Sequence, residues 1–329
     1  SLRSSPTSLI RGFSNLTNSL RMQKNMIDFT TESLIDFAIE NPRLLRIKPS
    51  IRYPHLSVAK YTKTAFFGSV WNQFLEESRG LVLNERGEIA VLPFRKIYNY
   101  GIDKESPKLP LDTMVTAYRK INGFMLGVTR VAGIDELVFS TTGSLDSEFV
   151  GLAKSVYDWC AKPEKFEAMI EPGYTYLFEC VHPADPHIIV EDTGLYYLGR
   201  RKHSFSAPVE NDMKTRFGFI NAGAIAPGEY RMTLGELIKK VKTVDHEGFV
   251  FYADTGETAK LKSPFYLAAK MFGRENLDVL LEGRARNRLD EELWPLVDYV
   301  ESIRERFETL TEQEKIGECR DFQIGRAHV

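Results

Sequence analysis

The sequence predicts an α+β fold with antiparallel sheets in a large N-terminal domain and helices in a small C-terminal domain. Runs rich in β-branched and aromatic residues recur through the middle of the chain, separated by turn residues. After residue 263, apolar residues follow helical spacing instead. No segment of 20 to 50 residues repeats, which excludes solenoids and propellers.

The first expected elements are a helix and a hairpin. A short helix opens at Thr31 and ends before Pro42, with the apolar residues Leu34, Ile35, Phe37, Ala38 and Ile39 at helical spacing. Residues 80–97 contain two β-rich runs joined by a turn that includes Gly87, which predicts a hairpin.

The middle of the chain is expected to be mostly antiparallel sheet. The predicted strands are residues 112–118, 124–130, 136–140, 174–181, 188–190, 194–199, 247–253 and 258–262. A helix is predicted over 147–161. Another begins at Thr233, because Thr233 and Glu236 have the spacing of a capping box.

A domain boundary is predicted near residue 264, where Ser263 can cap a helix and Pro264 can occupy its first position. Residues 1–263 then form the β-rich domain with an N-terminal helical and hairpin extension, and 264–329 form a helical domain. Helix is expected to about residue 316, with no pattern after Cys319. Its apolar stripe is predicted to be core: Leu277, Leu280, Leu281, Leu289, Leu293, Leu296 and Val300.

Composition limits the partners of the protein. Its 329 residues are 43% hydrophobic and 27% charged, which excludes disordered, collagen-like and coiled-coil classes. The net charge of −2 argues against binding through a general positive field. Residues 1–60 nevertheless carry 9 Lys or Arg against 4 Asp or Glu. Any contact with a polyanion is therefore expected on this first part or in a local groove.

The sequence also predicts a cytoplasmic location and no membrane partner. No stretch approaches the roughly 20 apolar residues of a membrane span, and the first residues lack a secretory pattern. The three cysteines lie far apart and form no CxxC pair, so neither a disulfide framework nor a cysteine zinc site is expected. We expect a monomer.

Chemistry is expected first at the string Lys120-Ile121-Asn122-Gly123. It lies between two strand-like runs, which predicts that Lys120 sits at a turn within a sheet. A lysine three residues before a glycine is common by chance. For this string alone, a solvated lysine beside a turn glycine is the stronger alternative.

Two lysines on one strand add a second observation. Lys260 and Lys262 have a spacing of two and therefore point to the same face of the sheet. On a solvated face this costs little. On the floor of a cleft the two charges need an anion such as a triphosphate, and Glu179 and Glu247 can add ligands to a Mg²⁺ ion held by its phosphates.

Seven segments in order resemble the nucleotidyltransferase motifs of the covalent ligase superfamily, most closely the RNA ligase 1 family of phage T4. They are ESRGLVLN, PFRKIYN, KING, FSTTGSL, YLFECVHP, EGFVFY and KLKSPFY, between residues 51 and 270. The resemblance implies an adenylyltransferase domain and an ATP-dependent RNA ligase that uses Mg²⁺ or Mn²⁺. Its implied partners are RNA 5′-phosphate and 3′-hydroxyl ends, with transfer RNA one candidate, in a phage-like repair setting in the host cytoplasm.

The resemblance implies a role for each matching residue. Lys120 would attack the α-phosphorus of ATP to form lysyl-AMP, Glu179 would hold the ribose, and Glu247 would help to bind the metal. The remaining matches would contact the nucleotide: Lys260 and Lys262 at the α-phosphate, Arg79 and Lys96 at the β- and γ-phosphates, and Gly123, Gly248, Tyr98 and Tyr266 at further positions.

Nucleophilic attack requires a neutral amine, and the ordinary pKa of lysine is about 10.4. Positive charge from Lys260, Lys262 and a metal is expected to lower the pKa of Lys120. We therefore expect Lys120 inside a pocket lined by the other cationic positions.

Three departures from the family pattern are visible. Phe124 follows the KxxG string where a small polar residue is usual, and Thr142 replaces a lysine, which removes one basic contact. The part after residue 264 is short, so specificity for transfer RNA is not carried over.

Other functions stay open. A self-adenylylating enzyme could act on DNA or a capped end, and a module without turnover could only bind RNA. The run Arg200-Arg201-Lys202-His203 either contacts RNA phosphates or ends a solvated strand. A further group could stack bases but is expected to be mostly core: Phe66, Phe67, Trp71, Phe94 and Tyr98.

Overall fold

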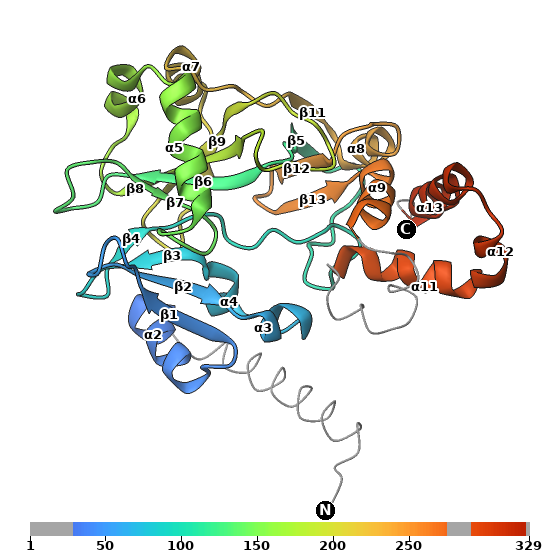
Figure 1. Cartoon of the computed structure of the whole chain (residues 1–329), viewed down its shortest axis with the longest axis horizontal. Helices are drawn as coiled ribbons and strands as arrows, with labels where there is room; N and C mark the ends of the chain where they lie inside the picture. The colour runs from blue at the N-terminus through green and yellow to red at the C-terminus, as the bar shows by residue number, and fades with distance from the viewer. Residues whose placement is uncertain (1–28, 275–290, 327–329) are drawn as a thin grey trace, which may run out of the picture.

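The computed structural model describes residues 29–274 and 291–326. Within them the chain forms three antiparallel sheets with helices packed against them (Figure 1). The predicted mixed fold with antiparallel sheets is confirmed. Part of the predicted C-terminal stripe lies outside the described residues: Leu277, Leu280, Leu281 and Leu289.

The N-terminal sheet has the strand order β1-β2-β3-β4. Its strands are β1 Leu45–Pro49, β2 Ser57–Tyr61, β3 Arg79–Leu83 and β4 Ile89–Val91, with the short helices α3 Lys63–Phe67 and α4 Gln73–Glu77 between β2 and β3. Helix α2 (Thr31–Glu40) covers one face, and its Leu34 and Phe37 are buried against the sheet. The predicted helix and hairpin are confirmed, although β4 ends at Val91 rather than near residue 97.

The five-stranded sheet has the order β10-β9-β8-β6-β7. Its strands are β6 Phe124–Thr129, β7 Val138–Ser140, β8 Tyr174–Val181, β9 Gly194–Lys202 and β10 Val209–Glu210. Helices α5 Glu148–Cys160, α6 Pro163–Met169 and α7 Met213–Asn221 pack on one face around Phe166, Phe178 and Phe219. Each such buried ring contributes roughly 1.5–3 kcal/mol.

A third sheet, here called the β12 sheet, has the order β11-β5-β12-β13. Its strands are β5 Met114–Arg119, β11 Glu229–Thr233, β12 Gly248–Ala253 and β13 Thr258–Lys262. Helix α8 (Leu234–Val241) packs Leu234 and Leu237 on this sheet. The capping box predicted at Thr233 is present, since the Thr233 hydroxyl accepts from the Glu236 N–H and the Glu236 carboxylate accepts from the Thr233 N–H.

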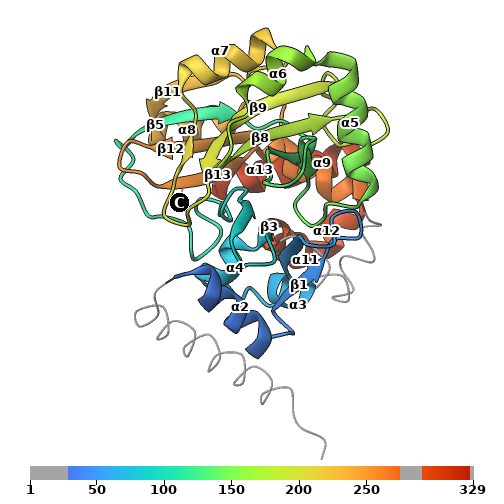
Figure 2. The same cartoon turned by 90° about the vertical axis from the view of Figure 1, so that its left-hand side faces the viewer.

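The C-terminal part is helical, as predicted, but in several pieces. It consists of α9 Pro264–Arg274, the short 3₁₀ turn η2 Glu291–Leu293, α11 Trp294–Ser302, α12 Arg304–Glu308 and α13 Glu312–Arg326. The Ser263 hydroxyl accepts from the Tyr266 N–H, which is the cap expected at the start of α9. Figures 1 and 2 place these helices beside the β12 sheet and the N-terminal sheet beneath the other two sheets.

Two local predictions are wrong. Residues 188–190 form no strand; the Ile189 N–H instead donates to the Asn122 side chain, 3.1 Å away, and Ile188 and Ile189 pack against the C-terminal helices. The tail after Cys319 continues as helix α13 to Arg326, because Cys319 and Phe322 pack on the C-terminal core.

A buried ion pair fastens the N-terminal sheet to the five-stranded sheet. The Arg201 guanidinium on β9 donates to both carboxylate oxygens of Glu77 on α4, at 2.7 and 3.0 Å, and to the Pro93 carbonyl at 2.9 Å. Its neighbour Arg200 pairs with Glu171 and Glu210. Both arginines of the run at 200–203 are therefore paired within the protein, whereas Lys202 is exposed at the end of β9. Contact of this run with RNA phosphates stays a prediction. Among the described residues, no helix is long and apolar enough to cross a membrane.

Candidate functional site

Lys120 lies where the chain crosses from one sheet to another. It follows β5 of the β12 sheet and precedes β6 of the five-stranded sheet, so it sits between two sheets rather than at a turn within one. Two glycines hold this crossing in place. The Lys120 N–H donates to the Gly248 carbonyl at 2.9 Å. Gly248 has φ +131°, and a Cβ at Gly123 would lie 2.3 Å from the Cys180 carbonyl oxygen, so side chains are excluded at both.

A cavity opens beside Lys120 between these two sheets. Four of the predicted site residues line it: Arg79, Lys120, Glu179 and Lys260. Aromatic and aliphatic side chains complete the wall, including Tyr118, Ile121, Met125, Val250 and Tyr252. The cavity therefore combines cationic groups with an apolar lining.

The register of the strands explains this lining. Tyr118, Val250 and Lys260 are successive partners across β5, β12 and β13, and side chains of directly opposed residues share a face. On the other sheet, Met125 of β6 is the partner of Glu179 of β8. Each sheet thus contributes a row of neighbouring side chains to the same cavity.

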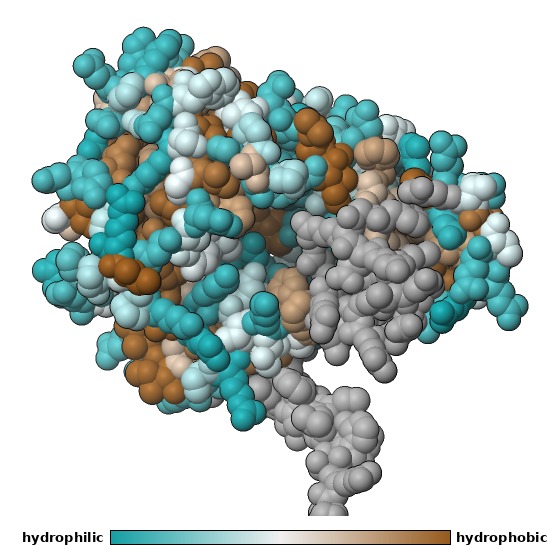
Figure 3. Space-filling view, in the orientation of Figure 1, coloured by the Kyte–Doolittle hydropathy of each residue, from teal (hydrophilic) through white to brown (hydrophobic). Residues whose placement is uncertain are grey.

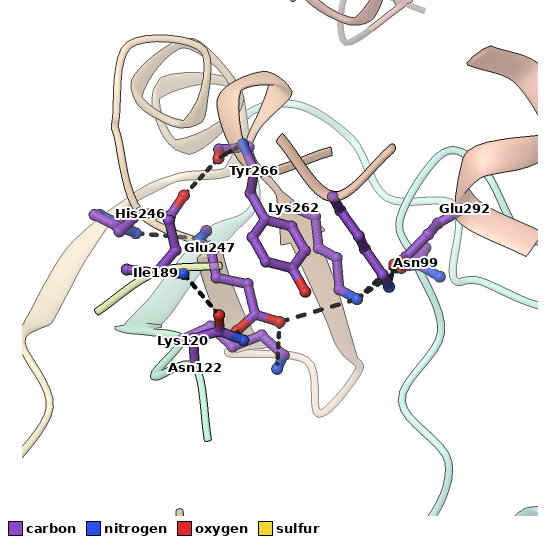
Figure 4. Close-up of polar contacts among 12 residues, drawn as sticks. Asn99, Lys120, Asn122, Ile189, His246, Glu247, Lys262, Tyr266 and Glu292 are labelled. Carbon is purple, nitrogen blue, oxygen red and sulfur yellow. Dashed lines mark hydrogen bonds and ion pairs between the residues drawn. The ribbon is translucent and has the colours of Figure 1, made fainter. Parts of the chain in front are cut away.

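A network of charged residues centres on Glu247 (Figure 4). One oxygen of its buried carboxylate lies 2.8 Å from the Lys120 Nζ and 3.9 Å from the Lys262 Nζ. The other oxygen accepts from the Asn122 amide at 3.2 Å. Lys120 is 24% exposed and lies against this carboxylate, so it is not a solvated surface lysine.

A second carboxylate lies on the far side of Lys262. Glu292, in the η2 turn of the C-terminal part, is 2.7 Å from the Lys262 Nζ and 2.6 Å from the Lys270 Nζ. These two ammonium groups outweigh the effect of burial and hold the pKa of Glu292 far below its usual range. The Tyr266 ring covers Lys262, with its centroid 5.5 Å from the Nζ. Lys262 is thus held between carboxylates from two parts of the chain.

The predicted pKa shift of Lys120 is wrong in direction for the protein without nucleotide. Burial and Lys262 lower the pKa of Lys120, but Glu247 and Glu179 together outweigh them and raise it. Lys260 shows the opposite result. Burial, Lys262, Lys120 and Arg79 depress the pKa of Lys260 well below its usual value, since Glu292 compensates only in part. An anion in the cavity would raise the pKa of Lys260 again.

Glu179 is expected to make stability depend on pH. Burial raises its pKa to about 7, with Lys120 opposing the shift. When the pKa of a carboxyl is higher in the folded than in the unfolded state, the folded protein binds its proton more tightly. The free energy of unfolding then falls as the pH rises from about 4.5 through 7. The free energy of unfolding of Glu179→Gln, relative to that of the parent, should therefore be roughly 2 kcal/mol greater at pH 8.5 than at pH 5, because one pKa unit corresponds to about 1.4 kcal/mol.

Urea unfolding of both proteins at the two pH values measures this difference. Glu301→Gln, which changes an exposed glutamate of α11, is the matched control and should leave the pH dependence of the parent unaltered. Parallel pH dependences for the parent and Glu179→Gln would show that Glu179 does not titrate in this range.

Seven of the predicted site residues lie outside the cavity lining: Lys96, Tyr98, Gly123, Glu247, Gly248, Lys262 and Tyr266. The Lys96 Nζ is 3.9 Å from the centroid of the Trp71 ring and 5.3 Å from that of Tyr98, so Lys96 is directed into an aromatic cluster. Tyr98 is buried, and its carbonyl accepts from the Lys260 N–H at 2.9 Å. Tyr98 therefore fixes the backbone of Lys260. The roles implied for Lys96 and Tyr98 at the nucleotide stay predictions.

Sequence analysis assigned no role to four residues around the site. Asn122 and Glu292 contact the charged network, and Lys270 shares Glu292 with Lys262. Lys60 on β2 extends to Gly143, where a Cβ would lie 2.4 Å from its Nζ. This ammonium group lies beside Thr142, the position at which the sequence predicted a missing basic contact. Only Asn122 carried a signal, as part of the KxxG string.

The donor set for a metal is small. Among residues 29–274 and 291–326, no group of three His, Cys, Asp or Glu side chains is arranged to hold an ion. Two carboxylates nevertheless act on the same amine, since Glu179 and Glu247 both raise the pKa of Lys120. Mg²⁺ commonly takes one or two protein carboxylates and completes its shell with phosphate oxygens and water. The site fits an ion that arrives with a polyphosphate.

Solved structures share this fold. A candidate ATP-dependent DNA ligase from Aquifex aeolicus has a TM-score of 0.55 and 13% identity, over 89% of this chain and 78% of that chain. An archaeal ATP-dependent RNA ligase has a TM-score of 0.55 and 14% identity, over 91% and 79% of the two chains. A second form of that ligase gives 0.54 and 12%, over the same shares. No family model and no curated protein matches the sequence. The chain therefore has the fold of these ligases.

Proposed function

We propose that the protein is an ATP-dependent RNA ligase that forms a covalent lysyl-AMP at Lys120. One observation carries the proposal: Lys120 lies at the junction of two sheets, in contact with the Glu247 carboxylate, in a cavity that also contains Arg79, Glu179 and Lys260. A nucleophile, cations for phosphates and an apolar wall for a base are thus present together. A solvated lysine beside a turn glycine would have none of these neighbours.

In the first step, the Nζ of Lys120 attacks the α-phosphorus of ATP. The N–P bond forms, the bond from the α-phosphorus to the bridging oxygen breaks, and pyrophosphate leaves with the electron pair. Lys260 and Arg79 line the same cavity and would neutralise charge that develops on the phosphate oxygens. Lys262 would contribute through its contact with Glu247, and Glu179 would hold the ribose.

Lys120 must lose a proton before this attack. In the protein alone its ammonium form is favoured by Glu247 and Glu179, so nucleotide binding has to change these contacts. Glu247 is the side chain that would help to hold Mg²⁺, whose charge when bound would neutralise phosphate oxygens and weaken the hold of this carboxylate on the ammonium. Asn122, which already donates to Glu247, keeps that carboxylate oriented.

The later steps would transfer AMP to an RNA 5′-phosphate and join that end to a 3′-hydroxyl with release of AMP. The fold neighbours include one protein described as a DNA ligase and one described as an RNA ligase. The choice of RNA therefore rests on the order of the sequence motifs. Joining of DNA, or transfer to a capped end, is the second candidate.

The test is incubation with α-labelled ATP and Mg²⁺, followed by a denaturing gel. We expect label that survives denaturation and is released by acid, as a phosphoramidate is. Ring closure of a 5′-phosphorylated single-stranded RNA then distinguishes RNA joining from sealing of nicked DNA. Absence of label would leave only a binding module, and sealing of DNA but not RNA would favour the second candidate.

A further inference from the structure

A row of cations crosses the N-terminal sheet and ends at the cavity. Arg46 on β1 and Lys60 on β2 are register partners, and Lys60 is in turn the partner of Arg79 on β3, where the register shifts between Ala59 and Lys60 and the Arg79 guanidinium donates to the Tyr61 hydroxyl. Neighbouring strands lie about 4.8 Å apart, so these three positions follow one another over about 10 Å. Lys48 is two residues beyond Arg46 and therefore on the same face of β1.

The outer part of this cationic row has no compensating carboxylate. Arg46, Lys48 and Lys60 are exposed, and their side chains make no ion pair or hydrogen bond with the described residues. The carboxylate of Asp146, beyond the end of β1, already accepts from the Ser50 hydroxyl and from two backbone N–H groups. Like charges opposite each other on adjacent strands are destabilising. These charges therefore do not stabilise the fold through contacts with the described residues.

The row is continuous with the cavity. The Lys60 ammonium group lies over Gly143, and the preceding residue, Thr142, lines the cavity together with Arg79. Figure 3 shows hydrophilic side chains interspersed with hydrophobic ones over the N-terminal sheet, in the lower left of that view. Arg46 and Lys48 do not line the cavity, so a nucleotide bound there does not account for them.

We propose that the cationic row binds the phosphodiester backbone of the polynucleotide strand whose end is joined at Lys120. This inference rests on the proposed function and adds the path of the substrate. A flexible strand carries one anionic phosphate per nucleotide, and a line of lysine and arginine side chains binds such a chain without reading its bases. The net charge of the whole protein is −2, so the row is a local feature and not part of a general positive surface.

The experiment measures binding of a labelled, 5′-phosphorylated single-stranded RNA by fluorescence anisotropy at several salt concentrations, without ATP. In Arg46→Gln/Lys48→Gln both substitutions remove charge and keep a long polar side chain. The slope of log affinity against log salt should decrease in magnitude by about 1.4, since each contact to a single strand contributes about 0.7. Adding Lys60→Gln should decrease it by about 0.7 more. A dinucleotide should bind the parent and the double variant equally, because it is too short to reach β1 from the cavity.

Lys165→Gln/Lys214→Gln is the matched control, because it removes two exposed lysines from α6 and α7 on another part of the molecule. It should keep the parent slope. An unchanged slope in Arg46→Gln/Lys48→Gln, or an equal change in the control, would overturn the proposal.

Self-labelling with ATP is measured separately on the same proteins and should not differ between Arg46→Gln/Lys48→Gln and the parent. If the parent is labelled but the slope of Arg46→Gln/Lys48→Gln is unchanged, the proposed binding of RNA by the cationic row is refuted and the ligase reaction is not. If the slope changes but the protein is never labelled, the ligase reaction is refuted and the binding of RNA by the cationic row is supported.

Discussion

Replacement of Lys120 by arginine should abolish covalent labelling by α-labelled ATP, with a loss of at least about 10³-fold. Arginine keeps a positive charge beside Glu247, so the buried carboxylate retains a partner. Its guanidinium stays protonated near neutral pH and is therefore not a nucleophile. The same substitution should leave noncovalent ATP binding largely intact, which titration calorimetry measures.

Lys120→Ala should lose labelling as completely and should also lower stability, because it leaves Glu247 without its closest cation. Lys165→Arg, on the exposed surface of α6, is the matched control and should label as the parent does. Label retained in Lys120→Arg would place the covalent bond on another residue and remove the basis of the proposed mechanism.

The sequence identified four of the residues that meet in the cavity. The spacing of two between Lys260 and Lys262 predicted a shared face, and β13 places both lysines in the same charged region. The order of motifs predicted that Arg79, Lys120, Glu179 and Lys260 share one site. All four line one cavity, although β3, β5, β8 and β13 lie far apart in the chain. Motif order predicts the position of these residues because each lies on a β-strand, or directly at its end, and that strand pairs with a particular neighbouring strand.

The charge state of Lys120 was not predictable from the same pattern. The expectation counted nearby cations along the motifs, whereas the largest opposing contribution comes from Glu247, which contacts Lys120 across two strands. The direction of a pKa shift depends on distances of a few ångströms and on burial, and spacing in sequence specifies neither. For the same reason Lys260, rather than Lys120, is the lysine with the depressed pKa.

The elements that sequence patterns missed are short or depend on distant partners. β1 and β2 are five residues each, and their alternation is visible only once α2 covers one face. The cationic row could not be predicted for the same reason. Its residues become neighbours only through the register in which β1, β2 and β3 pair. The predicted positive first part of the chain did point to this region without naming its residues.

Glu292 connects the C-terminal helices to the charged network, and its removal should have the second large effect. In Glu292→Ala, the buried ammonium groups of Lys262 and Lys270 lose a carboxylate at 2.7 and 2.6 Å. Loss of one partner of a buried ion pair costs about 3–5 kcal/mol, and here two cations lose the same carboxylate. We expect a decrease of about 4 kcal/mol in the free energy of unfolding, measured with urea at neutral pH.

A matched variant separates the loss of a charge from the loss of packing. Lys270→Met/Glu292→Leu removes one cation together with the carboxylate and fills both positions with apolar side chains, so it should be less destabilised than Glu292→Ala. Labelling should fall in both variants, because Lys262 then keeps only the longer contact with Glu247, at 3.9 Å. If Glu292→Ala unfolds and labels as the parent does, Glu292 does not orient Lys262.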